Sequence, residues 1–335
     1  MVSMKQIAEI CGVSVATVSK ALNGQKDIGE ETREIIKRKA EELGYMTNSA
    51  ARMLKTNRSY NLGVLFEDMG GLGLTHEFFA SVLEGFKTEA HAQGYDITFI
   101  SKSLMNRSST YLQHCNYRGF DGVGIICVNF FDSDVLDLIN SDIPVATVDH
   151  IFNNRISVVS DNVNGIETLV KYAYGKGHRR IAYIFGDDTS VTRNRLTGYY
   201  RAFESLGLEI NQKYIKQSRY YDTETSYAAV RELLALDNPP TCIIFPDDFS
   251  VIGGVRAISN AGLKVPEDVS VMGYDGVFVS QVMSPKITTY RQNAKQIGRT
   301  AASKLIELID HPNTTILDRI IVEGELIEGE SVKQL

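Results

Sequence analysis

The stretch 11-CGVSVATVSKALNG-24 carries a single charged residue, Lys20, and most of its polar groups are hydroxyls. Ser14 is a favourable N-cap for a helix over about residues 15–22, and the Asn-Gly pair that follows is typical of a helix end. An exposed helix usually carries more charge on its polar face than this one does. The pattern therefore predicts a short helix with an unusually small exposed face, which another molecule can approach closely.

Two further helices are predicted around this one. Ser3 and Gln6 have the spacing of a capping box, which predicts a helix that begins near residue 4 and ends at Gly12. Apolar residues at helical spacing predict another helix over residues 30–43. Three short helices, the first two joined by a turn that contains glycine, predict a helix-turn-helix head over residues 1–46.

The segment that follows, residues 47–60, is polar and basic and has no convincing core positions. It reads TNSAARMLKTNRSY, in which Asn48 is a candidate N-cap for a short helical stretch over residues 49–55. We therefore predict a linker that contains one short helix.

Beyond residue 60 the pattern changes to alternating strands and helices. Strand-like runs such as NLGVLF, GVGIICV, PVATVD, RRIAYIF and VSVMGYD are each followed by a helical segment or a loop. This alternation is typical of parallel sheets covered by helices on both faces. About 275 residues are too many for one such layer, so residues 61–335 are expected to form two doubly wound parallel α/β lobes.

Composition and charge limit the possible functions. The chain has 335 residues and a net charge of −6, but residues 1–60 alone carry +3, which leaves −9 for the remainder. Only the head is therefore suited to a polyanion. There is no run of 18 apolar residues and no signal-peptide pattern at the start, so we expect a cytoplasmic protein without a membrane span. The four cysteines are scattered without a CxxC pair, so neither a metal site nor a cofactor is expected.

Six stretches carry a resemblance to a known family. They are VSVATVSKALNG, EETREIIKRKAEELGY, NSAARMLKTNRS, GHRRIAYIFG, RLTGYYRAF and VPEDVSVMGYD, and their order and spacing resemble those of the LacI/GalR bacterial transcriptional repressors. The resemblance implies a periplasmic-binding-protein-like body. Its first lobe is expected over about residues 61–160 and 290–320, and its second over about 161–289 and 321–335.

The resemblance also implies partners for the head and the linker. A homodimer would bind pseudopalindromic double-stranded operator DNA, with the second helix of each head in a major groove. Hydroxyls suit phosphates and base edges, small apolar groups suit thymine methyls, and lysine suits guanine. The candidate DNA-contacting residues of this helix are Ser14, Val15, Ala16, Thr17, Ser19 and Lys20. In the linker, Leu54 matches the family's wedge at a central CG step, accompanied by Asn48, Ser49, Arg52 and Lys55.

Between the lobes the resemblance implies a cleft for a small effector, with a sugar or sugar derivative as the expected ligand. Most of the matching positions follow a predicted strand, where doubly wound sheets bind ligands. The candidate effector-binding residues are Phe78, Phe79, Asp149, His150, Arg195, Tyr221, Asp247, Asp275 and Gln292. Each also fits an ordinary structural role, as a core ring, a loop cap, an ion pair or a solvated side chain.

Other functions remain as alternatives. A nucleobase or a phosphoprotein could act as corepressor in place of a sugar inducer. A solute-binding protein is disfavoured because this chain has a head and lacks a signal-peptide pattern. An enzyme is disfavoured because no GxSxG, HExxH or P-loop lysine motif occurs, so no catalytic residue is expected.

Overall fold

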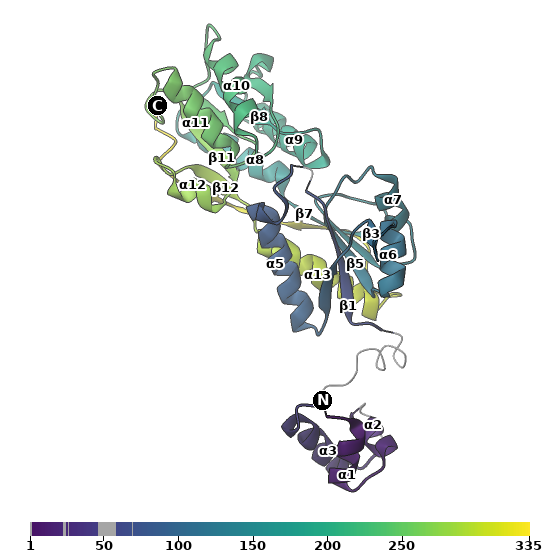
Figure 1. The fold of residues 1–335 in the computed structure, drawn as a ribbon. Helices are drawn as coiled ribbons and strands as arrows, with labels where there is room; N and C mark the ends of the chain where they lie inside the picture. The colour runs from purple at the N-terminus through teal and green to yellow at the C-terminus, as the bar shows by residue number, and fades with distance from the viewer. Residues whose placement is uncertain (1, 23–24, 26, 46–57, 69) are drawn as a thin grey trace. The chain divides into compact units, whose positions relative to one another are not determined.

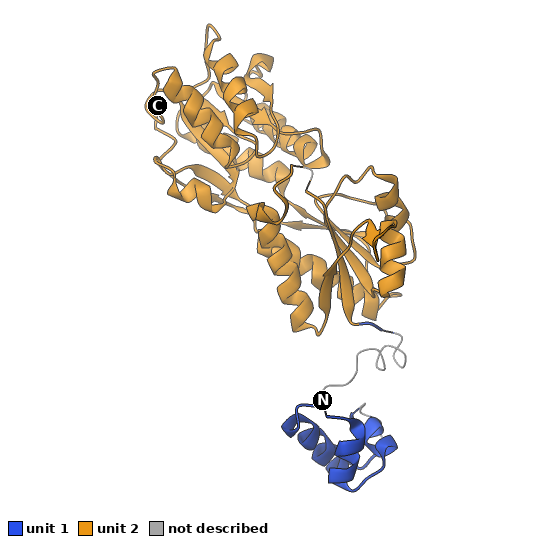
Figure 2. Cartoon of the chain, viewed as in Figure 1, with its two compact units in different colours: residues 1–59 blue, residues 60–335 orange. Residues whose placement is uncertain are grey.

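The computed structural model describes residues 2–22, 25, 27–45, 58–68 and 70–335. The chain forms two compact units, residues 1–59 and residues 60–335 (Figure 2). Each unit has its own hydrophobic core. The short helix predicted for residues 49–55 lies outside the described residues, as does the rest of the predicted linker, residues 47–60, apart from residues 58–60.

The first unit contains the three expected helices, α1 (Met4–Cys11), α2 (Val15–Leu22) and α3 (Glu30–Glu42). The capping box of α1 is present, since Ser3 accepts from the Gln6 amide while the Gln6 side chain accepts from the Ser3 amide. Gly12 ends α1 in the left-handed conformation, with φ 65°. Buried apolar side chains from all three helices form the core: Ile7, Ala8, Val18, Ala21, Ile36 and Ala40.

The first lobe of the second unit is built on a six-stranded parallel sheet in the order β2-β1-β5-β6-β7-β13. Its strands are β1 (Asn61–Phe66), β2 (Asp96–Phe99), β5 (Gly122–Cys127), β6 (Val145–Val148), β7 (Ile156–Ser160) and β13 (Arg319–Val322). A small hairpin, β3 (Ser103–Leu104) with β4 (Arg107–Ser108), lies outside this sheet.

Helices cover both faces of this sheet. One core contains side chains of α5 (Glu77–Ala92) and α13 (Ala294–Asp310), and the other contains side chains of α6 (Tyr111–Arg118) and α7 (Ser133–Ile139). A short 3₁₀ helix, η1 (Gly73–Thr75), precedes α5. Helices α5 and α13 lie side by side although about 200 residues separate them (Figure 1). A Cβ atom at Gly298 of α13 would stand 1.9 Å from the Val82 carbonyl oxygen, so this close approach requires glycine.

The second lobe repeats the plan in the order β9-β8-β10-β11-β12-β14. Its neighbouring strands are parallel except for β14, which is antiparallel to β12. The strands are β8 (Ile181–Phe185), β9 (Ile215–Gln217), β10 (Cys242–Ile244), β11 (Ser270–Asp275), β12 (Thr288–Arg291) and β14 (Glu325–Ile327). The helical elements are α8 (Asn162–Gly175), α9 (Ser190–Ser205), η2 (Gln212–Tyr214), α10 (Thr223–Leu234), α11 (Ser250–Asn260) and α12 (Phe278–Val282).

The chain passes between the lobes three times, and two crossings differ slightly from the expected boundaries. The first follows Ser160. The second follows Arg291 rather than residue 289, because β12 pairs with β11 of the second sheet. The third follows Val322 rather than residue 320. The run RIIVEGELIEG, which reads as one strand, is two short strands in different sheets because the chain crosses at Glu323-Gly324.

The expected fold class is confirmed in its main parts, a three-helix head followed by two doubly wound parallel α/β lobes. Within the described ranges, no helix is long and apolar enough to cross a membrane.

Candidate ligand cleft and nucleic-acid interface

A cavity of about 430 Å³ opens between the two lobes of the second unit, beyond the carboxyl ends of strands from both sheets. Doubly wound sheets bind ligands at this edge. The cavity is large enough for a small organic ligand. Eight of the nine predicted effector residues line it: Phe78, Phe79, Asp149, His150, Arg195, Tyr221, Asp275 and Gln292.

Arg195 of α9 is the buried cation of the cleft. Its Nε donates to the Asn162 side-chain oxygen at 2.7 Å, and its Nη1 donates to the Pro246 carbonyl at 2.7 Å. Its Nη2 lies 3.8 Å from Asp275 Oδ1, and the guanidinium carbon lies 3.7 Å from the centre of the Tyr274 ring. These contacts hold the guanidinium in one position, and the two hydrogen bonds use two of its five N–H donors.

Asp275 and Gln292 form a pair at the ends of neighbouring strands, β11 and β12. Gln292 Nε2 donates to Asp275 Oδ1 at 2.6 Å, and both residues are buried. Burial raises the pKa of Asp275 to about 7, although the neighbouring Arg195 guanidinium acts in the opposite direction. The other amide atom, Gln292 Oε1, is buried with no hydrogen-bond partner. The pair therefore presents an unused acceptor at the cleft.

The first lobe contributes Asp149 and His150, which follow β6. Burial raises the pKa of the Asp149 carboxyl and lowers the pKa of the His150 ring. The His150 ring stacks on Phe130 with 4.3 Å between ring centres and 16° between planes. This places a carboxyl group beside an aromatic wall, an arrangement suited to a ligand with both hydroxyls and an apolar face.

Asp247 does not line the cleft, which corrects the sequence-based expectation. Its side chain is fully buried behind the cavity wall. One carboxylate oxygen accepts from the Ser250 amide at 2.7 Å, and the other accepts from the Ser250 hydroxyl at 2.8 Å and the Tyr221 amide at 2.9 Å. Asp247 therefore holds the start of α11 and the backbone of Tyr221, rather than meeting a ligand itself.

Three lining residues have a positive backbone φ angle, which residues other than glycine rarely adopt. Asp149 has φ 57°, Tyr221 has φ 54° and Asp275 has φ 99°. Non-glycine residues with positive φ are uncommon, and they cluster at functional sites where the surrounding structure holds them. The hydrogen bond from the Tyr221 amide to Asp247 is one such restraint.

The two phenylalanines at the start of α5 differ in role. Phe78 is buried in the core of the first lobe and also lines the cavity. Phe79 is half-buried, and its ring meets Phe66 and His76 at 5.8 and 4.6 Å between centres. Phe79 is therefore the more exposed ring on this wall.

Contacts between the lobes run along the sides of the cleft. The His76 ring of the first lobe lies 3.9 Å, centre to centre, from the Tyr221 ring of the second. Glu77 accepts from the Phe278 amide at 2.7 Å, and the Ser190 hydroxyl donates to the Asp149 carbonyl at 3.0 Å. A change in lobe arrangement must rearrange these contacts.

Several lining residues escaped the sequence reasoning. Asp68 and Asp187 follow β1 and β8, so the rule that ligands bind beyond the carboxyl ends of strands could have found them. His76, Phe130 and Tyr220 also line the cavity, but they are positioned by ring contacts and loop paths that no local pattern reveals. Both His76 Nδ1 and the Tyr221 hydroxyl are buried without a partner.

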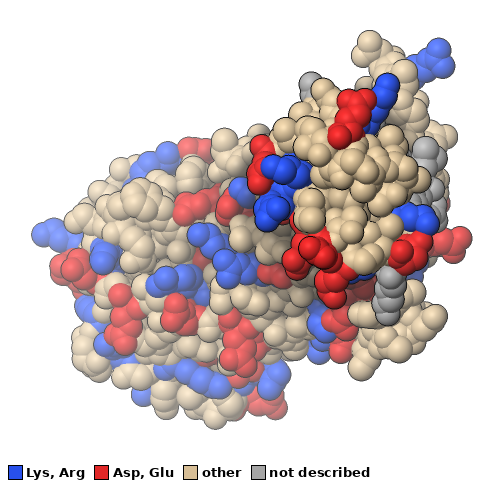
Figure 3. All heavy atoms as spheres, turned by 90° about the horizontal axis from the view of Figure 1, so that it is seen from below, with Lys and Arg blue, Asp and Glu red and all other residues tan. Residues whose placement is uncertain are grey.

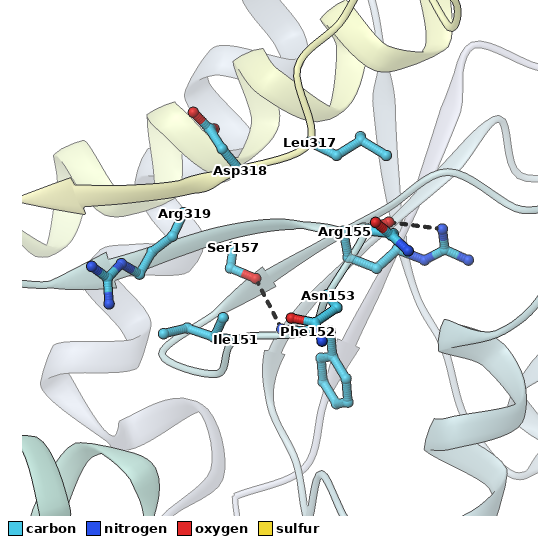
Figure 4. Close-up of a pocket in the computed structure, with 9 residues that line it drawn as sticks. Ile151, Phe152, Asn153, Arg155, Ser157, Leu317, Asp318 and Arg319 are labelled. Atoms are coloured by element: carbon cyan, nitrogen blue, oxygen red, sulfur yellow. Dashed lines mark hydrogen bonds between the residues drawn. The ribbon is translucent and has the colours of Figure 1, made fainter.

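A second depression, of about 440 Å³, lies on the first lobe where the loop after β6 meets the segment before β13 (Figure 4). Two of its polar side chains, Ser157 and Arg155, are committed to the protein. Ser157 Oγ accepts from the Phe152 amide, and Arg155 donates to the carbonyls of Ile139, Asn154 and Ser141. This depression is therefore a weaker candidate for a ligand than the cleft.

In the head, α2 exposes the small residues expected of a recognition helix. Ser14, Val15, Ala16 and Lys20 are exposed, whereas Thr17 and Ser19 are half-buried. Ser14 Oγ caps α2 by accepting from the Thr17 amide at 3.0 Å. Lys20 Nζ lies 2.5 Å from the Asp27 carboxylate, so its ammonium is already paired.

On the face of the molecule shown in Figure 3, basic and acidic side chains are interspersed.

The linker residues predicted to contact DNA are Asn48, Ser49, Arg52, Leu54 and Lys55, and all five lie outside the described residues.

The comparisons with known proteins agree with both parts of the chain. Residues 3–48 match the family of bacterial regulatory proteins, lacI family, and residues 170–332 match a periplasmic binding protein-like domain. The probable HTH-type transcriptional repressor ExuR of Bacillus subtilis is 30% identical over 100% of this chain and 99% of its own length. The chain belongs to the LacI family.

Further relatives of this LacI-family chain include the HTH-type transcriptional repressor PurR of Pasteurella multocida, which is 28% identical over 99% of each chain. Among solved structures, the lac repressor dimer bound to operator and anti-inducer is 22% identical, with a TM-score of 0.78 over 99% of each chain. A transcriptional regulator CelR–cellobiose complex is 24% identical, with a TM-score of 0.72 over 99% of this chain and 100% of its own. These structures share the fold described above.

Proposed function

We propose that this LacI-family protein is a homodimeric repressor of pseudopalindromic operator DNA, controlled by a sugar or sugar derivative in the interlobe cleft. The observation that carries the proposal is the cleft itself. Its lining brings Arg195, Asp149, Asp275 and Gln292 together from both lobes of a chain that also has a helix-turn-helix head. One solved structure with the same fold is a complex with cellobiose, which supports a sugar as the ligand class.

Control follows from differential affinity for two lobe arrangements. A ligand that binds one arrangement better shifts the population toward that arrangement. A ligand with equal affinity for both arrangements shifts nothing. The contacts His76–Tyr221, Glu77–Phe278 and Ser190–Asp149 link the lobes at the cleft, so they change with the arrangement. A coupling free energy of about 1–3 kcal/mol changes operator affinity by roughly 5–150-fold.

The proposed dimer uses an exposed apolar patch next to the Glu77–Phe278 hydrogen bond. Phe278 and Val282 of α12 are 69% and 58% exposed, and Leu74 of η1 is also exposed. Exposed large apolar side chains that gather in one place mark interaction surfaces. A twofold dimer would bury this patch and present two heads to the two half-sites of a palindrome.

On DNA, α2 would read the major groove through the exposed Ser14, Val15 and Ala16, with Lys20 at a guanine or a phosphate. Thr17 and Ser19 complete the proposed contact set. In the linker, Leu54 would enter the minor groove and open a central CG step, while Asn48, Ser49, Arg52 and Lys55 contact the backbone.

Selection of bound sequences from a random DNA library tests the DNA part of the proposal. We expect a palindrome with a central CG to be enriched. Leu54→Ala should weaken binding to that palindrome while leaving binding to random duplex DNA unchanged. Equal operator affinity in the variant and the wild type would contradict the wedge, and failure to enrich any palindrome would contradict the repressor function.

Thermal unfolding against a panel of sugars, nucleobases and their phosphates tests the ligand part. A ligand at about 100 times its Kd stabilises the protein by about 2.7 kcal/mol, which is a measurable change in Tm. A sugar that raises Tm should also change operator affinity in a titration. A nucleobase that does both would favour the corepressor alternative.

A further inference from the structure

We propose that Tyr60 and Asp121 form a junction that fixes the direction in which the chain from the head enters the second unit, so that both are positioning residues for operator binding. This inference rests on the proposed function, because it takes the head to bind a palindromic operator. Three observations carry it: the backbone conformation of Tyr60, the hydrogen bonds that hold this residue, and the helix that joins it to the cleft.

Tyr60 is the first residue of the second unit and directly precedes β1. Its φ is 54°, in the left-handed region that residues other than glycine seldom occupy. A bulky residue keeps such a conformation only where the surrounding structure holds it, and such residues cluster at functional sites. A change of φ to the value of about −120° that is usual in parallel strands would turn the preceding chain by roughly 170° about the N–Cα bond. One backbone angle therefore sets the direction from which the chain arrives.

Asp121, which is half-buried directly before β5, holds Tyr60 in this conformation. Its Oδ2 accepts from the Tyr60 amide at 2.9 Å, and its own amide donates to the Asn61 carbonyl at 3.1 Å. On the other side of β1, the Asp96 amide donates to the Tyr60 carbonyl at 2.9 Å. Of these three hydrogen bonds, the one to the Tyr60 amide is made by a side chain. A substitution at Asp121 can therefore remove that bond alone.

The Tyr60 ring packs at one end of a helix whose other end lines the cleft. The ring lies 5.4 Å, centre to centre, from that of Tyr95, which is buried in the core of the first lobe shortly after α5. Phe78 and Phe79, at the start of α5, line the cleft. The 16 residues of α5 span about 24 Å, from the interlobe region to the end of the lobe at which β1 begins (Figure 1). A rigid element therefore joins the cleft to the junction.

A fixed entry direction matters for a palindrome and not for random DNA. The two half-sites of a palindrome lie at a set separation, so a dimer must present its two heads at that separation. If the chain could enter the second unit in several directions, the heads would have to be ordered on binding, which lowers affinity. Binding to random duplex DNA depends on phosphate contacts and carries no such requirement. The junction should therefore act on operator affinity and on the preferred half-site spacing.

Two substitutions at Asp121 test the inference on the full-length protein. Asp121→Ala removes the acceptor, whereas Asp121→Asn keeps an oxygen that can accept from the same amide. Fluorescence anisotropy measures affinity for the palindrome selected by the wild type, for versions with the half-sites moved closer or further apart by a base pair, and for random duplex DNA.

We expect Asp121→Ala to bind the palindrome about tenfold or more weakly and to distinguish the spacings less well, because the heads are no longer preorganised. Asp121→Asn should stay within about threefold of the wild type, because the hydrogen bond to Tyr60 is kept. Both variants should bind random duplex DNA as the wild type does. A purely structural role for Asp121 would lower Tm and leave the spacing preference unchanged.

Asp142→Ala is the matched control. This exposed aspartate lies shortly before β6, at the same edge of the sheet as Asp121 before β5, and it should match the wild type with every DNA. If Asp121→Ala does not fold, Tyr60→Pro provides the same test, because proline has no N–H and sets φ to about −65°. It should bind the palindrome hardly better than random duplex DNA, whereas Tyr60→Phe should behave as the wild type.

The outcomes separate the junction from the proposed function. Wild-type affinity and spacing preference in Asp121→Ala, or in Tyr60→Pro, overturn the junction. An Asp121→Asn variant as weak as Asp121→Ala also overturns it, because the hydrogen-bond acceptor would then not be what matters. In both cases the wild type still enriches a palindrome, so the proposed function stands. A wild type that enriches no palindrome refutes the proposed function and the junction with it.

Discussion

Gln292 Nε2 donates a 2.6 Å hydrogen bond to Asp275 Oδ1, and this single contact fixes which polar atoms face the base of the cleft. Asp275 closes β11 and Gln292 follows β12, so the pairing of these two strands sets the distance between the side chains. The same carboxylate oxygen lies 3.8 Å from Arg195 Nη2. One buried carboxyl group therefore orients an amide and lies beside a guanidinium.

Asp275→Asn should flatten the dependence of Tm on pH. Burial raises the pKa of Asp275 to about 7, whereas an aspartate in an unfolded chain titrates near 3.9. Between these values the folded state holds a proton that the unfolded state has released, so this group lowers stability as pH rises from about 4 to 7. Asparagine does not titrate and still accepts from Gln292.

Thermal unfolding at intervals from pH 4.5 to 8 measures this effect. The dependence should be reduced rather than abolished, because burial also raises the pKa of Asp149 and Asp247. The exposed Asp237→Asn serves as the control and should follow the wild-type curve. Parallel curves for Asp275→Asn and the wild type would show that Asp275 is already ionised throughout this range.

Asp247→Ala should destabilise the second unit although Asp247 does not line the cleft. The change leaves the buried Ser250 amide and hydroxyl and the Tyr221 amide without their acceptor. Unsatisfied buried donors cost about 1–3 kcal/mol each, so a total loss of about 2–4 kcal/mol is expected after partial relaxation. Urea unfolding measures it. Asp237→Ala should stay within about 0.5 kcal/mol, as expected of an exposed side chain, and a similar value for Asp247→Ala would contradict the structural role.

Asp27→Asn should strengthen binding to random duplex DNA and make it more sensitive to salt. Lys20 Nζ lies 2.5 Å from the Asp27 carboxylate, which competes with phosphate for the same ammonium. Each additional phosphate contact made by a freed cation should steepen the slope of the logarithm of the binding constant against the logarithm of the salt concentration by at most about 0.9. Fluorescence anisotropy at several salt concentrations measures this slope.

The control for that experiment is Glu42→Gln, which removes the same charge from the same unit. Glu42 pairs with Lys39 of α3 rather than with the recognition helix. Its salt slope should therefore change less than that of Asp27→Asn. Equal slopes for the two variants would show that only the net charge of the head matters.

Phe278→Asp should convert the proposed dimer to a monomer. The aromatic side chain is largely exposed on α12, and an aspartate there would place a charge in the buried interface. Sedimentation velocity at micromolar concentration should show a monomer, and operator affinity should fall because only one head binds at a time. Ile316→Asp changes another exposed apolar residue, outside this patch, and should remain dimeric. A dimeric Phe278→Asp would place the interface elsewhere.

Local chemistry is what the sequence by itself determined. The capping box of Ser3 and Gln6 joins residues only three apart in the chain. The alternation of strands and helices follows from apolar runs, which indicate the strands that are buried on both faces. The resemblance to the LacI/GalR family, together with the rule that ligands bind at the carboxyl ends of parallel strands, predicts Asp149, Asp275 and Gln292 for the cleft, and all three line it. These features depend on neighbouring residues or on a general property of the fold.

Only the tertiary structure decided which of these side chains face the cavity. Asp247 follows a strand just as Asp149 does, yet it turns inward because the Tyr221 and Ser250 amides offer it donors. The contact of His76 with Tyr221, and the division of RIIVEGELIEG between two sheets, join segments that are far apart in the chain. Their partners lie tens to hundreds of residues away, so no local pattern encodes them, and packing and hydrogen bonding across the whole unit determine them.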